Sequence, residues 1–300
     1  MKVYRIYQVD SFTKNKFYGN PAGVIPNADG LSNEQMQQIA RELNNSETAF
    51  VFSPIAPNYD MEVRFFTPTK EVPICGHATI ATHYIRALEG EKIGKVLQKT
   101  RAGILPVEII QEKDDFSITM TQGKPKVETP LDRQIIDEII HALGLKIQDI
   151  RQDCPVAISS TGHSKVMIGI KENQCLNTLK PNLESLSVLS SKLHCNGYYL
   201  FTLNFNEKPF IRGRMFSPAI GIAEDPVTGN ANGALGAYLV TYRIAKHLET
   251  PNNLSFEILQ GEAIQRLGSM CVNVEIKNGK PFLVKITGKA VVCFKTEISI

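Results

Sequence analysis

Long apolar runs, paired cysteines and clustered basic residues are all missing from this sequence of 300 residues. No stretch reaches the roughly 18 apolar residues that a membrane-spanning helix needs. The first residues alternate polar and apolar side chains and lack the apolar block of a signal peptide. A net charge of +3 without a basic run argues against a nucleic-acid partner. We therefore expect a cytoplasmic protein that binds neither nucleic acid nor a membrane.

Several signatures of metal, nucleotide and hydrolase chemistry are missing too. The six cysteines form no CxxC pair and no zinc-type spacing, so free thiols are expected in a reducing compartment. His77 and His83 are six residues apart and fall on different faces of a helix. The segment 229–236 has neither the dinucleotide spacing nor the lysine of a phosphate loop, and no GxSxG elbow occurs. No metal and no cofactor is expected.

The composition is that of an ordinary globular protein, with 43% hydrophobic and 21% charged residues. The length suits two domains or two lobes. Periodicity and capping signals predict five helices, at 32–43, 76–88, 131–143, 183–193 and 228–242. Strands are expected at 3–9, 49–53, 61–66, 96–98, 107–110, 117–120, 156–159, 164–170, 198–203 and 211–216. A turn is expected at 19–23, and short strands from 254 to 300. This mixture indicates an α+β fold.

The sequence repeats itself weakly at half its length. Shifted by 150 residues, Phe66-Thr67-Pro68 falls on Phe216-Ser217-Pro218. After a three-residue insertion, Cys75-Gly76-His77-Ala78-Thr79 falls on Thr228-Gly229-Asn230-Ala231-Asn232. Both stretches open a helix rich in small residues. The shared order of strand, turn, loop and helix predicts a duplication. Two similar lobes would each present a helix N-terminus to a shared cleft.

These two helix starts suggest anion chemistry. A helix N-terminus has unpaired N–H groups and a partial positive charge, so it binds carboxylates well. Gly76 and Gly229 would let a ligand approach the backbone, although helix packing is an alternative reason for each glycine. Two such ends could hold a carboxylate and stabilise charge that develops beside it.

Three titratable residues lie at these elements. Glu47 stands where a polar segment enters an apolar strand, which favours a general acid/base; a solvated loop glutamate is the alternative. His77, in the first helical turn, suits a neutral hydrogen-bond donor or acceptor better than a cation. Asp225 precedes the second helix, and its alternative is a simple turn aspartate before Pro226.

Five motifs, in order, give the chain a specific resemblance. They are Gly19-Asn-Pro-Ala-Gly23, Ser46-Glu47-Thr48-Ala49-Phe50, Phe66-Thr67-Pro68, Cys75-Gly76-His77-Ala78-Thr79 and Glu224-Asp225-Pro226-Val227-Thr228-Gly229-Asn230-Ala231. Together they resemble the PhzF-like isomerases of phenazine biosynthesis, relatives of diaminopimelate epimerase, from about residue 4 to 298. The resemblance implies two pseudo-symmetric lobes, each a β-barrel-like sheet around a central helix. It also implies lobes at 1–125 and 126–283, a linker near 122–129, and residues 284–300 completing the first lobe.

The resemblance assigns roles by motif position. Glu47 would be the general acid/base that moves a proton between carbons, with His77 and Asp225 assisting. Gly76, Gly229 and Asn230, with Cys75 and Thr228, would line the substrate. The expected partner is a small amino- or hydroxy-carboxylate, and a homodimer is left open.

Cys75 separates the competing functions. Diaminopimelate epimerase uses two cysteines, one at each helix start, and only the first has a counterpart here, since the second half carries Asp225 and Thr228. A one-base proton shuttle by Glu47 therefore fits better than a two-thiol racemase. The alternatives are an amino-acid epimerase with Glu47 and Cys75 as its two bases, or a non-catalytic ligand-binding protein.

Overall fold

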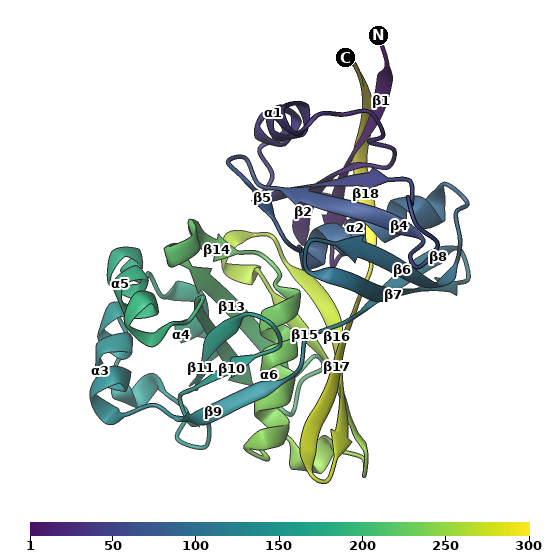
Figure 1. Cartoon of the computed structure of the whole chain (residues 1–300). Coiled ribbons are helices and arrows are strands. Elements are labelled where there is room, and N and C mark those ends of the chain that lie inside the picture. Colours follow the sequence, from purple (N-terminus) through teal and green to yellow (C-terminus); the bar gives the residue numbers. More distant parts are fainter. The chain divides into compact units, whose positions relative to one another are not determined.

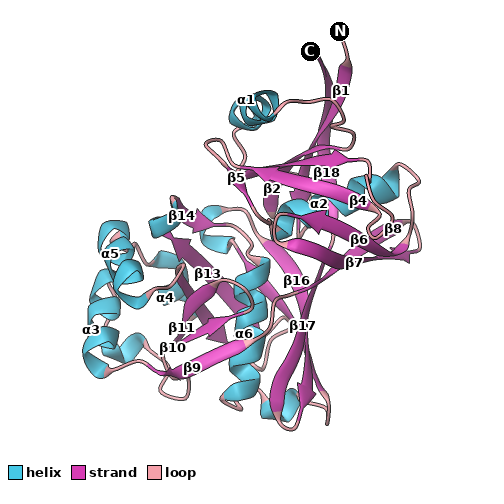
Figure 2. Cartoon of the chain, in the orientation of Figure 1, coloured by secondary structure: helices cyan, strands magenta, loops and turns pink.

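The computed structural model describes residues 1–300, which divide into two compact units. Unit 1 comprises residues 1–121 and 287–300, and unit 2 comprises residues 122–286. Figures 1 and 2 show the elements of both units, which are strand-rich with few helices. The expected α+β class is confirmed. None of the helices is long and apolar enough to span a membrane.

Unit 1 is built from ten strands and two helices along the chain. In order these are β1 (Val3–Ser11), β2 (Asn20–Ile25), α1 (Asn33–Leu43), β3 (Glu47–Phe52), β4 (Met61–Phe66), β5 (Glu71–Val72), α2 (Gly76–Leu88), β6 (Gly94–Thr100), β7 (Gly103–Glu112), β8 (Asp115–Thr121), the last residues of β17 (Lys280–Gly288) and β18 (Ala290–Ser299). The C-terminal strand β18 pairs antiparallel with β1, so the first and last strands of the chain lie side by side (Figure 1).

Unit 2 contains the remaining strands and helices. They are β9 (Lys126–Pro130), α3 (Arg133–Ala142), β10 (Ala157–Ser160), β11 (Ser164–Ile170), α4 (Asn173–Thr178), α5 (Leu183–Leu193), β12 (Tyr198–Leu203), β13 (Ile211–Ser217), β14 (Ile222–Asp225), α6 (Gly229–Thr241), β15 (Asn253–Gln260), β16 (Gly268–Lys277) and most of β17. Four short 3₁₀ turns lie at Ile147–Asp149, Pro218–Ile220, Lys246–Leu248 and Glu262–Ile264.

The two units repeat one strand topology. In unit 1, β2 runs parallel to β3, β3 antiparallel to β4, and β4 parallel to β6. In unit 2, β11, β12, β13 and β15 have the same relations. Even the register agrees: Thr48 faces Phe66, and Tyr198 faces Phe216, so both partners shift by 150. The predicted duplication is confirmed at the level of topology.

A buried helix runs through each unit (Figure 2). Ten of the thirteen residues of α2 are buried, and the helix packs on β1, β2, β3, β7, β8 and β18. Eleven of the thirteen residues of α6 are buried, against β9, β10, β11, β15 and β16. Small residues allow this depth: a Cβ on Gly236 would lie 2.7 Å from a methyl carbon of Val274. A helix enclosed on all sides is largely apolar around its circumference, and the few polar side chains that α2 and α6 bury, such as His83 and Asn232, are hydrogen-bonded.

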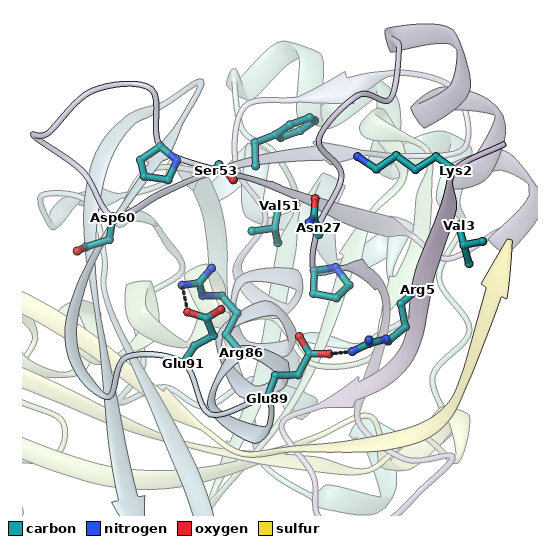
Figure 3. A pocket seen from close by; sticks show the side chains of 13 residues that line it. Lys2, Val3, Arg5, Asn27, Val51, Ser53, Asp60, Arg86, Glu89 and Glu91 are labelled. Atoms are coloured by element: carbon teal, nitrogen blue, oxygen red, sulfur yellow. Dashed lines mark hydrogen bonds and ion pairs between the residues drawn. The ribbon is translucent and has the colours of Figure 1, made fainter. Parts of the chain in front are cut away.

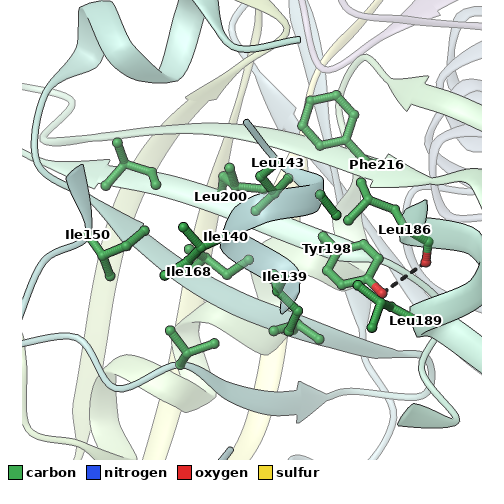
Figure 4. Packing of buried hydrophobic residues seen from close by; sticks show 14 of the residues in the cluster. Ile139, Ile140, Leu143, Ile150, Ile168, Leu186, Leu189, Tyr198, Leu200 and Phe216 are labelled. Atoms are coloured by element: carbon green, nitrogen blue, oxygen red, sulfur yellow. Dashed lines mark hydrogen bonds between the residues drawn. The ribbon is translucent and has the colours of Figure 1, made fainter. Parts of the chain in front are cut away.

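Outer helices cover the opposite faces of the strands. Helix α1 begins with the predicted capping box, because Ser32 Oγ accepts from Gln35 N and the Gln35 side chain accepts from Ser32 N. In unit 2, α3 and α5 bury Ile139, Ile140, Leu186 and Leu189 against β11 and β12 (Figure 4). Tyr198 donates to the carbonyl of Leu186 at 3.0 Å, which ties β12 to α5.

Some expectations for the secondary structure were wrong. The predicted turn at 19–23 is mostly strand β2: only Gly19 has the left-handed conformation (φ 63°), and Ala22 already pairs with Glu47. Strands β5 and β14 and helix α4 were not predicted. The expected linker at 122–129 is partly strand, because β9 pairs with β10. The strands β15 to β18 are eight to ten residues long, not short.

Candidate active site

Glu47, Cys75 and His77 come together in unit 1. Glu47 is the first residue of β3, Cys75 is the N-cap of α2, and His77 is the second residue of that helix. Glu47 Oε2 lies 3.4 Å from His77 Nε2, and Cys75 Sγ lies 3.4 Å from His77 Nδ1. The imidazole therefore stands between a carboxylate and a thiol. This is an arrangement in which protons can be held and passed on.

Local hydrogen bonds fix this cluster. Ser11 Oγ donates to the carbonyl of His77 at 2.7 Å, and Thr79 Oγ1 donates to the carbonyl of Cys75 at 2.7 Å. Ser46 Oγ lies 3.2 Å from His77 Nε2, so the ring contacts both Ser46 and Glu47. The segment 46–47 is held in turn, because β3 pairs with β2 from Ala22↔Glu47 onward.

The cluster is largely screened from solvent. The side chain of His77 is 8% exposed and that of Glu47 15%. Ligand atoms of Glu47, Cys75 and His77 all lie within 4.8 Å of one another, and oxygen, sulfur and nitrogen donors are types that zinc accepts. A partly buried carboxylate beside an imidazole is also what a general acid/base needs, because few water molecules compete for its proton.

Gly76 leaves open space at the start of α2. A Cβ built on this glycine meets no heavy atom within 4 Å, so packing within the protein does not require glycine here. The free N–H groups of the first helical turn follow directly. The geometry is that of a helix start that a ligand can approach closely.

In unit 2 the predicted residues gather at the start of α6. Asp225 ends β14, Thr228 is the N-cap, and Gly229 and Asn230 are the first helical residues. Thr228 Oγ1 donates to Asp225 Oδ2 at 2.5 Å. The loop before α6 is thus closed by its own side chains, with the Asp225 carboxylate pinned to the N-cap.

Gln260, which the sequence analysis missed, organises this loop from β15. Its Oε1 accepts from Thr228 N at 3.1 Å and from Asn232 Nδ2 at 2.9 Å. Its Nε2 donates to the carbonyl of Asp225 at 2.8 Å and to Thr228 Oγ1 at 3.1 Å. Four hydrogen bonds from one buried amide fix the position of Asp225. Gln260 and Thr228 are 32 residues apart, and no local sequence pattern predicts their contact.

A duplicated ion pair precedes each helix start and was also missed. In unit 1, Arg64 Nε and Nη2 donate to the two carboxylate oxygens of Glu71 at 2.8 and 2.6 Å. In unit 2, Arg214 makes the same pair of bonds to Glu224 at 2.9 and 2.7 Å. Each pair joins the strand before the loop to the short strand that leads into the helix. Bidentate pairs of this kind fix geometry as well as charge.

A surface pocket of about 530 Å³ in unit 1 lies away from these residues (Figure 3). It is lined by charged groups near the C-terminal end of α2, opposite to the end that carries Gly76. Arg5 pairs with Glu89 and Arg86 with Glu91, so its charges satisfy one another. The pocket carries none of the predicted site residues.

Comparison with known proteins places this fold in a family. The model of the family described as phenazine biosynthesis-like protein (PhzC-PhzF) matches residues 9–296. An uncharacterised isomerase of Clostridium acetobutylicum is 54% identical over 301 residues, covering 99% of both chains. The uncharacterised isomerase YddE of Escherichia coli is 45% identical, covering 99% of this chain and 98% of its own.

Relatives with a named reaction and solved structures extend this. Trans-2,3-dihydro-3-hydroxyanthranilate isomerase of Pseudomonas aeruginosa is 30% identical, covering 95% of this chain and 96% of its own. The crystal structure of a PhzF-family phenazine biosynthesis protein of Bacillus anthracis superimposes with a TM-score of 0.90 at 32% identity, over the full length of both chains. A hydroxyproline epimerase of Agrobacterium vitis shares the fold alone: its TM-score is 0.62 at 11% identity, covering 99% of this chain and 91% of that one.

The duplicated strands around two central helices, with relatives named as isomerases along their full length, define this chain as an enzyme of the isomerase class. It belongs to the phenazine biosynthesis-like, or PhzC-PhzF, family. The family resemblance predicted from the five motifs is confirmed.

Proposed function

We propose that this protein is a cofactor-independent isomerase that moves a proton on a small amino- or hydroxy-carboxylate, with Glu47 as general acid/base. The observation that carries the proposal is the contact of 3.4 Å between Glu47 Oε2 and His77 Nε2 beside the open start of α2. The relative that isomerises a dihydro-hydroxyanthranilate, whose name describes an amino- and hydroxy-substituted carboxylate, supports the substrate class.

The proposed step conserves the proton. The Glu47 carboxylate takes a proton from one carbon of the substrate, and the electron pair shifts toward a neighbouring double bond or carbonyl. The N–H groups at the start of α2 and the His77 ring stabilise the negative charge that develops. Glu47, whose acid proton can exchange with solvent, then delivers a proton to another carbon on the same face. Asp225 keeps the assisting role that the family resemblance implies, held in place by Thr228 and Gln260.

Epimerisation is the second candidate, and one contact favours it. Cys75 Sγ lies 3.4 Å from His77 Nδ1, which places a thiol beside an imidazole that could deprotonate it. An epimerase would use Cys75 and Glu47 as its two bases: one takes the proton from the stereocentre, and the other delivers its own proton to the opposite face of the same carbon. The two candidates therefore differ in the carbon that acquires solvent hydrogen.

Solvent deuterium exchange tests both candidates. A panel of amino- and hydroxy-carboxylates is incubated with the enzyme in deuterated water, and NMR locates the deuterium. For any compound turned over, Glu47→Gln should lower the rate by about 10²–10⁴-fold, because the amide cannot carry the proton. Glu62→Gln, a half-buried glutamate of β4 paired with Lys99, is the matched control.

The outcomes separate cleanly. Full activity of Glu47→Gln would contradict the proposal. A large loss in Glu47→Gln with a mild effect of Cys75→Ala supports the one-base shuttle. An inactive Cys75→Ala, with deuterium at the original stereocentre, supports epimerisation instead.

A further inference from the structure

Lys165 of β11 is a buried cation that the proposed mechanism does not use. The residue is 3% exposed. Its ammonium donates one hydrogen bond, a long one of 3.4 Å, to the carbonyl of His163. It forms no ion pair, although an ammonium offers three donors. Burial of a cation without a carboxylate in contact is costly, which makes Lys165 a candidate for a functional site.

The lysine lies on the face of the strands that α6 covers. Lys165 is directly opposite Ser159 in the β10–β11 pair, and residues opposite each other share one face of the sheet. Ser159 Oγ donates to the carbonyl of Ala234 in α6 at 2.8 Å, which fixes that face. The next hydrogen bond along reaches the helix start, from Thr161 Oγ1 to the carbonyl of Asn230 at 3.1 Å.

The charges around Lys165 are consistent with this place. Burial lowers the pKa of Lys165 to about 8, while the negative charge of Asp225 and the thiol of Cys195 oppose that shift. Near neutral pH the side chain of Lys165 therefore remains a cation, and it lies at the N-terminal end of α6, near Asp225. The same burial, with the Lys165 charge, lowers the pKa of His163.

The duplication shows which residues of unit 1 correspond to Lys165 and its neighbour in unit 2. The shift of 150 that maps Thr48 onto Tyr198 maps Glu47 onto Gly197. Gly197 has no room for a side chain, because a Cβ there would lie 2.3 Å from the carbonyl oxygen of Phe216. Glu47 pairs with Ala22 of β2; since Gly23↔Thr48 corresponds to Val166↔Tyr198, Lys165 occupies the place of Ala22. In this repeated strand pair the charged residue is therefore Glu47 on the second strand of unit 1 and Lys165 on the first strand of unit 2.

An unsatisfied acceptor lies at the same helix start. Asn230 Oδ1 is buried and has no hydrogen-bond partner. A buried amide oxygen without a donor is uncommon, and it accepts readily from a hydroxyl or amino group. Asn230 Oδ1 lacks a hydrogen-bond donor, and Lys165 lacks an anion. An amino- or hydroxy-carboxylate supplies both, the donor from its amino or hydroxyl group and the anion from its carboxylate.

We propose that Lys165 is the residue that anchors the carboxylate of the ligand in unit 2, with Asn230 accepting from the neighbouring hydroxyl or amino group. This deepens the proposed function by assigning the substrate class to named side chains. A charged hydrogen bond from a buried ammonium is strong, because water does not compete for it. The backbone N–H groups at the start of α6 would share the anion.

Binding of small probes to the full chain tests this without a known substrate. Lactate, lactamide and propionate are compared at matched ionic strength, by the shift of the thermal unfolding temperature and by calorimetric titration. Lactate should stabilise the wild type; lactamide, which lacks the carboxylate, should not. Lys165→Met should weaken lactate binding by at least about tenfold. Its unfolding temperature without ligand should equal or exceed that of the wild type, because a buried unpaired charge is gone. Lys171→Met, an exposed lysine just beyond the same strand, is the control.

A second variant keeps the test decisive if Lys165→Met folds poorly. Asn230→Ala should bind propionate as the wild type does and lose the preference for lactate over propionate. Unchanged lactate binding in Lys165→Met, an unchanged preference in Asn230→Ala, or no lactate-dependent shift in the wild type at tens of millimolar would each overturn the proposal. The two proposals can fail separately, because lactate binding by Lys165→Met tests Lys165, whereas deuterium exchange by Glu47→Gln tests Glu47.

Discussion

The start of α2 in unit 1 carries Cys75 and His77 beside Glu47, whereas the corresponding start of α6 in unit 2 carries Thr228 and Asn230 near Asp225. The supports beneath these groups were kept in both copies. Thr79 donates to the N-cap carbonyl in unit 1, and Asn232, its counterpart, does so in unit 2. The two units thus share the strand topology and the hydrogen bond to the N-cap carbonyl, whereas the side chains at the two helix starts differ.

The two arginine pairs give the strongest test of this comparison. Arg214 is 7% exposed and also donates to the carbonyls of Leu176 and Leu179. Arg214→Met should lower the free energy of unfolding by about 3–5 kcal/mol, because Glu224 is then buried without a partner. Urea unfolding followed by circular dichroism measures this.

The equivalent variant in unit 1 should cost less. Arg64 is 19% exposed, and Glu71 keeps a second cation, Arg101, at 2.6 Å. Arg64→Met should therefore cost roughly 1–3 kcal/mol. If Arg64→Met lowers the free energy of unfolding as much as Arg214→Met or more, then burial and the second cation Arg101 do not account for a difference between the two ion pairs.

Acid should destabilise unit 1 through its central helix. His83 is fully buried, with its Nε2 2.8 Å from Gln98 Oε1 and its Nδ1 unpartnered. Burial lowers the pKa of His83 from 6.5 to about 4. Between these values the unfolded chain binds a proton that the native chain does not, so the free energy of unfolding falls as pH drops from 6.5 to 4, by about 3 kcal/mol.

The counterpart of His83 in α6, at a shift of 153, is Gly236, so the central helix of unit 2 carries no such histidine. The difference between wild type and His83→Gln in urea unfolding, followed from pH 7 to pH 4, isolates the histidine from the carboxylates. His141→Gln, on the exposed face of α3, is the control. A pH-independent difference between wild type and His83→Gln would contradict the expectation.

The smallest effect on stability is expected at Gly76. Because a Cβ there meets only open space, Gly76→Ala should raise the free energy of unfolding by roughly 0.5–1 kcal/mol through the loss of backbone freedom in the unfolded chain. If a ligand approaches this helix start, deuterium incorporation should nonetheless slow. In α6 the contrast is Gly236→Ala, which should destabilise by about 1–3 kcal/mol because its Cβ would clash with Val274. Normal turnover by Gly76→Ala would weaken the functional role of the glycine.

Local sequence signals predicted those features of the structure that depend on residues close together in the chain. The capping box of Ser32 and Gln35 predicted the start of α1, and the small-residue helices were predicted to begin within one residue of Gly76 and Gly229. The spacing of 150 residues predicted the repeated topology. Glu47 and His77, proposed from their motifs, lie within 3.4 Å of each other.

Features that depend on distant partners could not be read in this way. Strand β14 exists because Asp225 pairs with Met215, and the sequence before it shows no alternation. Gln260 looks like any polar residue at a strand end, although it holds the loop before α6. Lys165 stands in an apolar strand, and lysine is so rarely buried that its position carried no signal.

The pairing of β18 with β1 has a consequence for synthesis on the ribosome. Lys2 and Ile300 exchange backbone hydrogen bonds of 2.7 and 2.9 Å. Strand β1 is synthesised early, but this edge of it can pair only after β18 has been synthesised. Unit 2 is one continuous stretch of the chain, whereas unit 1 is completed only by residues 287–300. Until β18 pairs with β1, unit 1 therefore has an open strand edge that other chains can join.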